Sequence, residues 1–236
     1  MLTNEEKRKY IKQIMLSEIG LAGQEKIRHT KVAVVGCGGL GCPVLLYLAS
    51  AGIGTIGMID FDTVSITNLH RQVLYGNNDV GKKKVQVAKE KIGVLHPEVK
   101  LVEHDAMIKA ENANAILEQY DLVIDGSDNF ETRYLVNDVC VQLGKPLVYG
   151  SILGFQGQLA LFNYKGSKNL RDIFPEPPGA DEVPDCSENG VLATVPGMIG
   201  SMMANECLKV ILELSELKNN FVLMDCLTLR TNVISY

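Results

Sequence analysis

A glycine-rich turn is the first stretch of the chain with a clear chemical use. The apolar run Lys31-Val-Ala-Val-Val35 leads directly into Gly36-Cys-Gly-Gly-Leu-Gly41, and an apolar helix is expected over residues 43–51. Glycines let the backbone approach phosphate oxygens closely, and the helix offers free N–H groups and the positive end of its dipole. The predicted phosphate-binding glycines are Gly36, Gly38 and Gly41. Tight packing of the helix on the sheet is an alternative use of the same glycines.

An acidic residue completes this pattern. Asp60 follows the glycines by about 20 residues, at the end of the next expected strand. A carboxylate at this place can bind ribose hydroxyls. The pattern predicts a nucleotide site, but it is shared by proteins that bind NAD and by proteins that bind ATP.

The polar stretch that follows favours ATP. It reads Asp60-Phe-Asp-Thr-Val-Ser-Ile-Thr-Asn-Leu-His-Arg-Gln72, and Gly81-Lys-Lys-Lys84 comes next. Asn68 and Arg71 are one helical turn apart, so both can face one ligand. Arg71 offers a planar fork for phosphate oxygens and Lys84 a point charge, as a site that stabilises charge developing at an α-phosphate requires. The further nucleotide-binding candidates of this stretch are Asp62 and Thr67.

A second polar turn lies at the end of another buried strand. Ser127-Asp-Asn129 follows the apolar run Tyr120-Asp-Leu-Val-Ile-Asp125, which places Asp128 in the crevice at the carboxyl edge of the sheet. A carboxylate beside a triphosphate can hold Mg²⁺. Asp128 is also well placed to be the N-cap of the next helix, and the motif alone supports both interpretations. Asn129 is counted with the nucleotide-binding candidates.

The elements that must position these residues alternate between strand and helix, which predicts an α/β fold of the Rossmann type with a mostly parallel sheet. Antiparallel strands are expected to extend the sheet in the second half, starting at 157–164. We expect one domain over 1–236. Its expected parts are N-terminal helices in 1–30, a nucleotide-binding half in 31–152 and a second half in 153–236. The other expected elements are strands at 54–60, 99–104, 120–125, 146–151 and a pair in 221–235, and helices at 4–19, 80–95, 111–119, 130–143 and 196–214.

Composition excludes several classes of protein. A net charge of −5 argues against a nucleic-acid binder that neutralises phosphates. No apolar run reaches the roughly 18 residues that span a bilayer, and the N-terminus lacks the apolar region of a signal peptide. We therefore expect a cytoplasmic protein with no membrane partner. None of the six cysteines forms a C-x-x-C pair, so no structural zinc is expected.

Taken together, these motifs resemble the ThiF/MoeB/HesA adenylyltransferases, bacterial relatives of the ubiquitin-activating enzymes. The shared motifs, in family order, are G-C-G-G-L-G, D-F-D-T-V-S-I-T-N-L-H-R-Q, V-G-K-K-K, D-G-S-D-N, G-Q-L-A-L-F and C-S-E-N-G-V. The resemblance implies that Gly39 and its neighbours bind ATP and that Asp60 binds the ribose. It further implies that Asn68, Arg71 and Lys84 contact the phosphates and that Asp128 holds Mg²⁺.

The resemblance also implies the substrate and the assembly. A small ubiquitin-like sulfur carrier protein would present its C-terminal Gly-Gly carboxylate to the α-phosphate, and pyrophosphate would leave. The second half of the chain would bind this carrier, with a crossover loop at about 165–190. A homodimer is implied, in which the N-terminal helices and the helix near 40–51 are candidate interface elements. No rhodanese-like extension is present, so we expect any sulfur donor to be a separate protein.

The chain departs from the family pattern in three places. The family's R-Y-x-R-Q appears as Lys9-Tyr-Ile-Lys-Gln13, so Lys12 replaces an arginine implied to reach the partner's nucleotide and lacks its two-pronged geometry. Asn169-Leu-Arg-Asp172 stands where many relatives have the first half of a zinc site, which is consistent with a zinc-free variant. Cys186 stands where some members have a thiol that accepts the acyl group or sulfur, and a spectator cysteine explains it equally well.

Two other functions fit parts of the sequence. An NAD-dependent oxidoreductase would use the glycines and Asp60, but it gives Arg71, Lys84 and Asp128 no clear role. A catalytically silent homologue that binds the carrier without adenylylating it is the other alternative, suggested by Lys12 and the missing zinc ligands.

Overall fold

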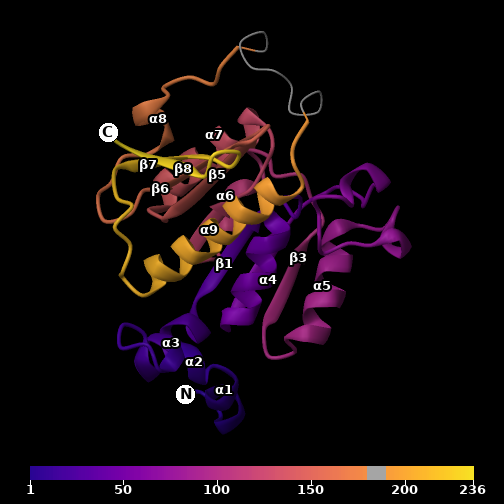
Figure 1. The fold of residues 1–236 in the computed structure, drawn as a ribbon, viewed down its shortest axis with the longest axis vertical. Helices are drawn as coiled ribbons and strands as arrows, with labels where there is room; N and C mark the ends of the chain where they lie inside the picture. Colours follow the sequence, from indigo (N-terminus) through magenta and orange to yellow (C-terminus); the bar gives the residue numbers. More distant parts are fainter. Residues whose placement is uncertain (180–189) are drawn as a thin grey trace.

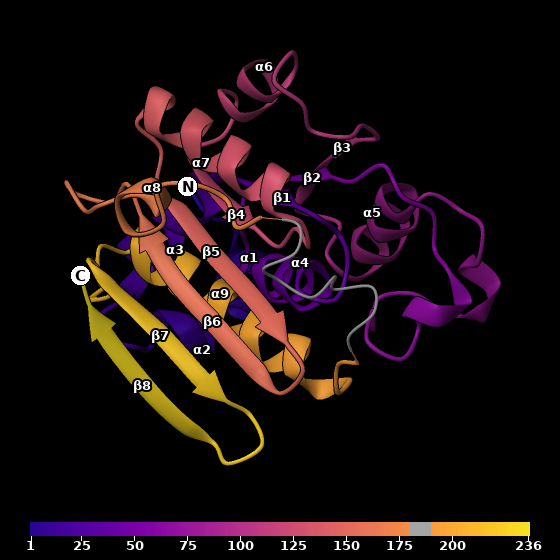
Figure 2. The same ribbon diagram turned by 90° about the horizontal axis from the view of Figure 1, so that it is seen from above.

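The chain folds around one mixed sheet. The computed structural model describes residues 1–179 and 190–236. Figure 1 shows the sheet and its helices in the described part of the chain. Its eight strands are arranged in the order β3-β2-β1-β4-β5-β6-β7-β8, which can be followed in Figure 2. Neighbouring strands from β3 to β5 are parallel, whereas β5 to β8 are antiparallel, so the predicted fold class is confirmed. The strands are β1 (Lys31–Val35), β2 (Thr55–Ile59), β3 (Lys100–His104), β4 (Leu122–Asp125), β5 (Leu147–Leu153), β6 (Gln156–Phe162), β7 (Asn220–Asp225) and β8 (Arg230–Ser235).

Helices cover both faces of this sheet (Figure 2). The helices α4 (Gly41–Ala51), α5 (Lys84–Leu95) and α9 (Thr194–Ile211) contribute to one buried cluster, and α6 (Ala113–Leu117), α7 (Phe130–Leu143) and α8 (Leu170–Ile173) contribute to the other. Strands that are buried on both faces need apolar residues at successive positions rather than at every second one. This requirement explains the continuous apolar runs of β1 and β4.

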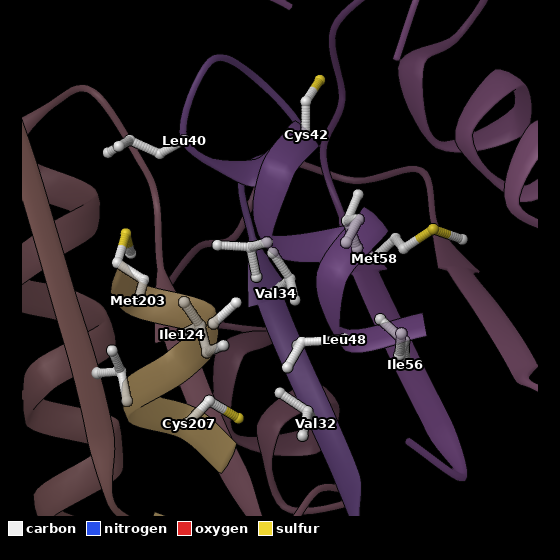
Figure 3. Packing of buried hydrophobic residues seen from close by; sticks show 14 of the residues in the cluster. Val32, Val34, Leu40, Cys42, Leu48, Ile56, Met58, Ile124, Met203 and Cys207 are labelled. Carbon is white, nitrogen blue, oxygen red and sulfur yellow. The ribbon is translucent and has the colours of Figure 1, made fainter. Parts of the chain in front are cut away.

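The core of the first cluster lies between the parallel strands and two helices. Val32 and Val34 of β1 and Ile124 of β4 face Leu48 of α4 and Met203 of α9 (Figure 3). All five side chains are fully buried. Truncating one such side chain to alanine costs about 2–5 kcal/mol, so this packing fixes α4 firmly on the sheet.

A glycine allows α9 to approach the start of α4. A Cβ atom at Gly200 would lie 2.4 Å from Cγ of Pro43 and 2.6 Å from the carbonyl oxygen of Leu40. Leu40 is the N-cap residue of α4 and belongs to the glycine-rich turn. The close contact of α9 therefore helps to set the position of that turn.

The N-terminal helices pack at the other end of α4. They are α1 (Asn4–Lys9), α2 (Ile11–Ile14) and α3 (Gly20–His29), and Figure 1 shows them together at one end of the molecule. The side-chain amides of Gln13 and Gln24 both donate to the carbonyl oxygen of Ala51, at 3.1 and 2.9 Å. Because α4 spans about 16 Å, these helices lie a helix length away from the glycine-rich turn.

Several expected boundaries were wrong by a few residues. The helix expected from residue 80 begins at Lys84, because Gly81 adopts a positive φ of 87° and the turn pairs with Thr63 and Val64. The expected helices 111–119 and 196–214 are Ala113–Leu117 and Thr194–Ile211. Residues 165–190 were expected to lack helices, but they contain α8.

One candidate interface element belongs to the core. Most of α4 is buried within this chain against the sheet and α9, although Tyr47 is exposed. The helix near 40–51 is thus chiefly a core helix. By contrast, the N-terminal segment exposes Ile11 of α2 and, just after that helix, Met15 and Leu16. Across the described residues, we find no helix whose length and apolar character would let it cross a membrane.

The contact between α9 and α4 can be tested by substituting glycines of one helix. Gly200→Ala is expected to lower the free energy of unfolding by about 2 kcal/mol, because the new methyl group forces the two helices apart. Gly197→Ala is the matched control, since a Cβ there meets no heavy atom within 4 Å. The control should gain up to about 1 kcal/mol from helix propensity. Urea unfolding measures both, and equal stabilisation by the two substitutions would contradict the packing described above.

Candidate active site

A cavity of about 790 Å³ opens at the carboxyl ends of the parallel strands. It is lined by the glycine-rich turn after β1, the loop after β2, the start of α5 and the turn after β4. Cavities of this size hold small-molecule ligands. The predicted site residues that line it are Gly36, Gly38, Gly39, Asp60, Asp62, Thr67, Asn68, Arg71, Lys84, Asp128 and Asn129.

At two positions of the glycine-rich turn, only glycine fits. Gly36 has a φ of 87°, and a Cβ there would lie 2.9 Å from the carbonyl oxygen of Gly126 at the end of β4. A Cβ at Gly41 would lie 2.0 Å from the carbonyl oxygen of Gly36. Gly41 does not line the cavity, and its close approach to Gly36 gives it a packing role. The free N–H groups of the first turn of α4 begin beside Gly38 and Gly39.

Asp60 fastens this turn to the end of β2. One carboxylate oxygen accepts the backbone N–H of Cys37 at 2.7 Å, and the other accepts the backbone N–H of Asp62 at 2.8 Å. Burial raises the pKa of Asp60, while Lys84 and the two N–H groups act in the opposite direction. Each oxygen keeps a lone pair, so the carboxylate can still accept hydroxyl groups of a ligand.

Lys84 places a buried positive charge at the cavity. Its side chain is only 6% exposed, and its ammonium group lies 2.8 Å from Oδ2 of Asp62. Burial acts to lower the pKa of Lys84, but Asp60, Asp62 and Asp128 outweigh it and raise the pKa. The lysine therefore keeps its charge at neutral pH, as binding to phosphate requires.

A short helical segment presents the second cation. Ser65 is the N-cap of the 3₁₀ helix Ile66–Asn68, and the carbonyl oxygen of Asn68 accepts the N–H of Arg71 at 3.1 Å. The guanidinium donates to the carbonyl oxygen of Thr67 at 3.2 Å, which uses one of its five N–H groups. His70 also lines the cavity, and its Nδ1 lies 3.1 Å from the same carbonyl oxygen.

The structure separates the two interpretations of Asp128. The N-cap of α7 is Asn129, whose Oδ1 accepts the N–H of Thr132 at 2.9 Å. Asp128 is exposed and lines the cavity. Its carboxylate accepts a long hydrogen bond of 3.4 Å from the side-chain amide of Asn129. The cap interpretation of Asp128 was wrong, and its carboxylate faces the cavity with oxygens available to a cation.

Sequence reasoning missed a buried arginine at the same edge. Arg133 is 5% exposed, lines the cavity and donates to the carbonyl oxygens of Gly150 at 2.8 Å and Ser127 at 2.6 Å. Its guanidinium also lies 4.9 Å from the ring centroid of Tyr149. It ties the turn before Asp128 to β5. The burial of Arg133 could not be predicted from the sequence, because most arginines on helices with both polar and apolar residues are exposed to solvent.

Besides Gly41, two predicted residues are not placed at the cavity. Lys12 lies exposed on α2, at the opposite end of α4 from the cavity of its own chain. Cys186 lies outside the described residues. The segment Asn169–Asp172 forms a capped turn of helix, held by two contacts of Arg171 with Asp138 at 2.7 and 2.8 Å. Among residues 1–179 and 190–236, no group of three or more His, Cys, Asp or Glu side chains could hold a metal ion.

Comparisons with known proteins agree with the motifs. The model of the ThiF family matches residues 10–235. A sulfur carrier protein adenylyltransferase of Thermus thermophilus is 46% identical over 231 residues, which cover 95% of this chain and 85% of that protein. An adenylyltransferase and sulfurtransferase MOCS3 of Anopheles gambiae is 49% identical over 211 residues, or 89% of this chain. The chain spans about half of the MOCS3 relative, whose matched share is 48%.

Solved structures share the fold. A crystal structure of PaaA has a TM-score of 0.84 and 21% identity, over 99% of this chain and 74% of that one. Escherichia coli MccB with MccA-N7isoASN has a TM-score of 0.86 and 24% identity, over 99% of this chain and 72% of that one. At these identities the likeness concerns the arrangement of helices and strands.

The different roles of two adjacent residues predict different effects on stability. Asn129→Ala is expected to lower the free energy of unfolding by about 1 kcal/mol, because the first turn of α7 loses its cap. Asp128→Ala should change it by less than about 0.5 kcal/mol. Urea unfolding without ligand measures both variants. A larger loss for Asp128→Ala than for Asn129→Ala would contradict the assignment of the cap.

Proposed function

The chain belongs to the ThiF family, and we propose that it is an ATP- and Mg²⁺-dependent adenylyltransferase acting on a small ubiquitin-like sulfur carrier protein. The observation that carries the proposal is the charge pattern of one cavity. Lys84 and Arg71 supply positive charge, and Asp60 offers an acceptor whose position is fixed. The carboxylate of Asp128 is not used as a helix cap and faces the cavity. Together they suit a nucleotide whose α-phosphate is attacked.

The relatives support the proposed substrate. The Thermus protein carries the name sulfur carrier protein adenylyltransferase, and this chain covers most of its length. The MOCS3 relatives are named for a sulfurtransferase activity as well, but only about half of their length corresponds to this chain. We therefore propose only the adenylylation step for this chain. The carrier would end in Gly-Gly, like the carriers implied by the motifs.

The proposed chemistry requires no side-chain nucleophile. A carboxylate oxygen of the carrier's C-terminal glycine forms a bond to the α-phosphorus of ATP, and the bond to the β-phosphate oxygen breaks. The products are an acyl-adenylate and pyrophosphate. Positioning and charge stabilisation therefore supply the rate enhancement.

The chain's own groups divide this work. Asp60 accepts the ribose hydroxyls, and the backbone of the turn at Gly38 and Gly39 lies against the phosphates. Arg71 and Lys84 stabilise the negative charge that develops at the phosphates, with Asn68 beside them. Asp128 would hold Mg²⁺, which when bound supplies further positive charge to the triphosphate.

The N-terminal helices fit a role in a homodimer. Lys12 cannot contribute to the cavity of its own chain, because it lies at the far end of α4. The exposed side chains of Ile11, Met15 and Leu16 surround it with apolar surface. We propose that this surface meets a second copy, where Lys12 would reach the partner's phosphates.

An exchange assay tests the function directly. With Mg²⁺ and a carrier that ends in Gly-Gly, the chain is expected to exchange labelled pyrophosphate into ATP, because formation of the acyl-adenylate is reversible. A carrier that lacks its last two residues is the matched control and should support no exchange. ATP binding without exchange for any intact carrier would favour the silent homologue, and stabilisation by NAD but not by ATP would favour the oxidoreductase.

The role of Arg71 gives a sharper test within the chain. Arg71→Ala is expected to reduce exchange by roughly 10²–10³-fold, because one donor to developing charge is lost. Lys82→Ala removes an exposed cation close by that does not line the cavity, and it should retain nearly full activity. Both variants should unfold at the wild-type urea concentration. An equal loss of activity in the two variants would indicate a general effect of charge.

A further inference from the structure

Cys37 turns both of its backbone groups toward the protein interior. Its N–H donates to Asp60 at 2.7 Å. Its carbonyl oxygen accepts the hydroxyl of Tyr75 at 2.8 Å and the thiol of Cys42 at 3.6 Å. All of these partners are buried, so the conformation of the glycine-rich turn is fixed at its second residue from two sides.

This anchoring decides what the next residues present to the cavity. Gly38 and Gly39 line the cavity, whereas Cys37 does not. A glycine backbone has more conformational freedom than any other, so a turn of three glycines in four residues keeps one shape only if contacts impose it. The hydroxyl of Tyr75 is the strongest contact available to the carbonyl of Cys37, because a thiol is a weak donor.

Tyr75 also belongs to the segment that carries Arg71. Its N–H donates to the carbonyl oxygen of Gln72 at 3.0 Å, and the N–H of Gln72 donates to Asn68 at 3.0 Å. The buried side chain of Gln72 lies against Gly38, where its Nε2 would be 3.4 Å from an added Cβ. The turn and the arginine segment are therefore joined at two points.

We propose that Tyr75 is a positioning residue for the nucleotide, whose hydroxyl holds the glycine-rich turn at a fixed distance from the segment that bears Arg71. Tyr75 is 6% exposed and does not line the cavity, so it acts through Cys37 and not by touching the ligand. The inference rests on the proposed function, because it takes the ligand of this cavity to be a nucleoside triphosphate.

The physical effect is one of preorganisation. Without the hydroxyl, the carbonyl of Cys37 loses its main partner and the free turn samples more conformations. Binding of ATP must then order the turn, and this cost reduces affinity. The loss of one buried hydrogen bond corresponds to about a tenfold change in the dissociation constant.

The test compares two tyrosines with the same chemistry. Tyr75→Phe removes only the hydroxyl that contacts Cys37. Tyr134→Phe is the matched control, since its buried hydroxyl donates to the backbone carbonyls of Phe174 and Glu176, away from the glycine-rich turn. Calorimetric titration of the full chain with Mg-ATP, without carrier, gives the dissociation constant. Thermal unfolding without ligand gives the stability of each variant.

We expect Tyr75→Phe to weaken ATP binding by about tenfold and Tyr134→Phe to leave it unchanged, while both lower the melting temperature. In the exchange assay, Tyr75→Phe should raise the KM for ATP more than it lowers kcat. Cys42→Ala removes the longer contact to the same carbonyl, together with the contact of the thiol with the Tyr75 hydroxyl, and should weaken binding less than Tyr75→Phe.

The outcomes separate this inference from the proposed function. Wild-type affinity in Tyr75→Phe, or an equal weakening in Tyr134→Phe, would overturn the anchor and leave the adenylyltransferase proposal standing. Thermal unfolding without ligand shows that Tyr75→Phe is folded before its affinity is compared. A wild-type chain that binds no ATP would overturn both proposals.

Discussion

The carboxylate of Asp60 accepts backbone N–H groups from two loops, and the geometry of the cavity depends on this pair of contacts. One N–H comes from the turn after β1 and the other from the loop after β2. The carboxylate therefore joins two strands at the edge where their ligand must lie. The same negative charge, with that of Asp62, keeps Lys84 protonated although it is buried. A single acidic residue thus positions the glycine-rich turn proposed to bind phosphates and keeps a buried cation charged beside it.

The sheet explains why these groups meet. Parallel strands bring their carboxyl ends to one edge, so residues that follow β1, β2 and β4 become neighbours. Tight contacts then remove freedom from the loops. The carbonyl of Gly36 leaves room for only a glycine at position 41, and α9 fixes the start of α4 through Gly200. These contacts restrict the loops at the cavity, which suits the catalysis by positioning that we propose.

The sequence was informative wherever a pattern is local. Apolar runs located the parallel strands, and the spacing of glycines and acidic residues located most of the cavity lining. The ambiguity of Asp128 could not be resolved in this way, because two adjacent polar residues compete for one cap and their backbone angles decide the outcome. Lys84 was predicted as a point charge for phosphates, but its burial could not be predicted because it depends on packing against residues distant in sequence.

Contacts between distant residues set the remaining limit. Nothing in the spacing of Tyr75 and Cys37 indicates that a hydroxyl meets a backbone carbonyl, and an aromatic residue at the end of an apolar stretch is typical of a core. Arg133 is similar, since its partners are carbonyl groups of two separate strands or turns. The start of α5 was misplaced because a bridge to Thr63 overrides the helical preference of the preceding lysines.

The most direct measurement follows the phosphorus atoms of ATP. The chain, Mg²⁺ and an intact carrier would be mixed with ATP labelled either at the α-phosphate or at the γ-phosphate, and the carrier would be isolated after rapid quenching. The account predicts that only the α label joins the carrier and that the γ label leaves in pyrophosphate. A carrier that acquires the γ label, or cleavage that releases inorganic phosphate alone, would contradict adenylyl transfer at this cavity.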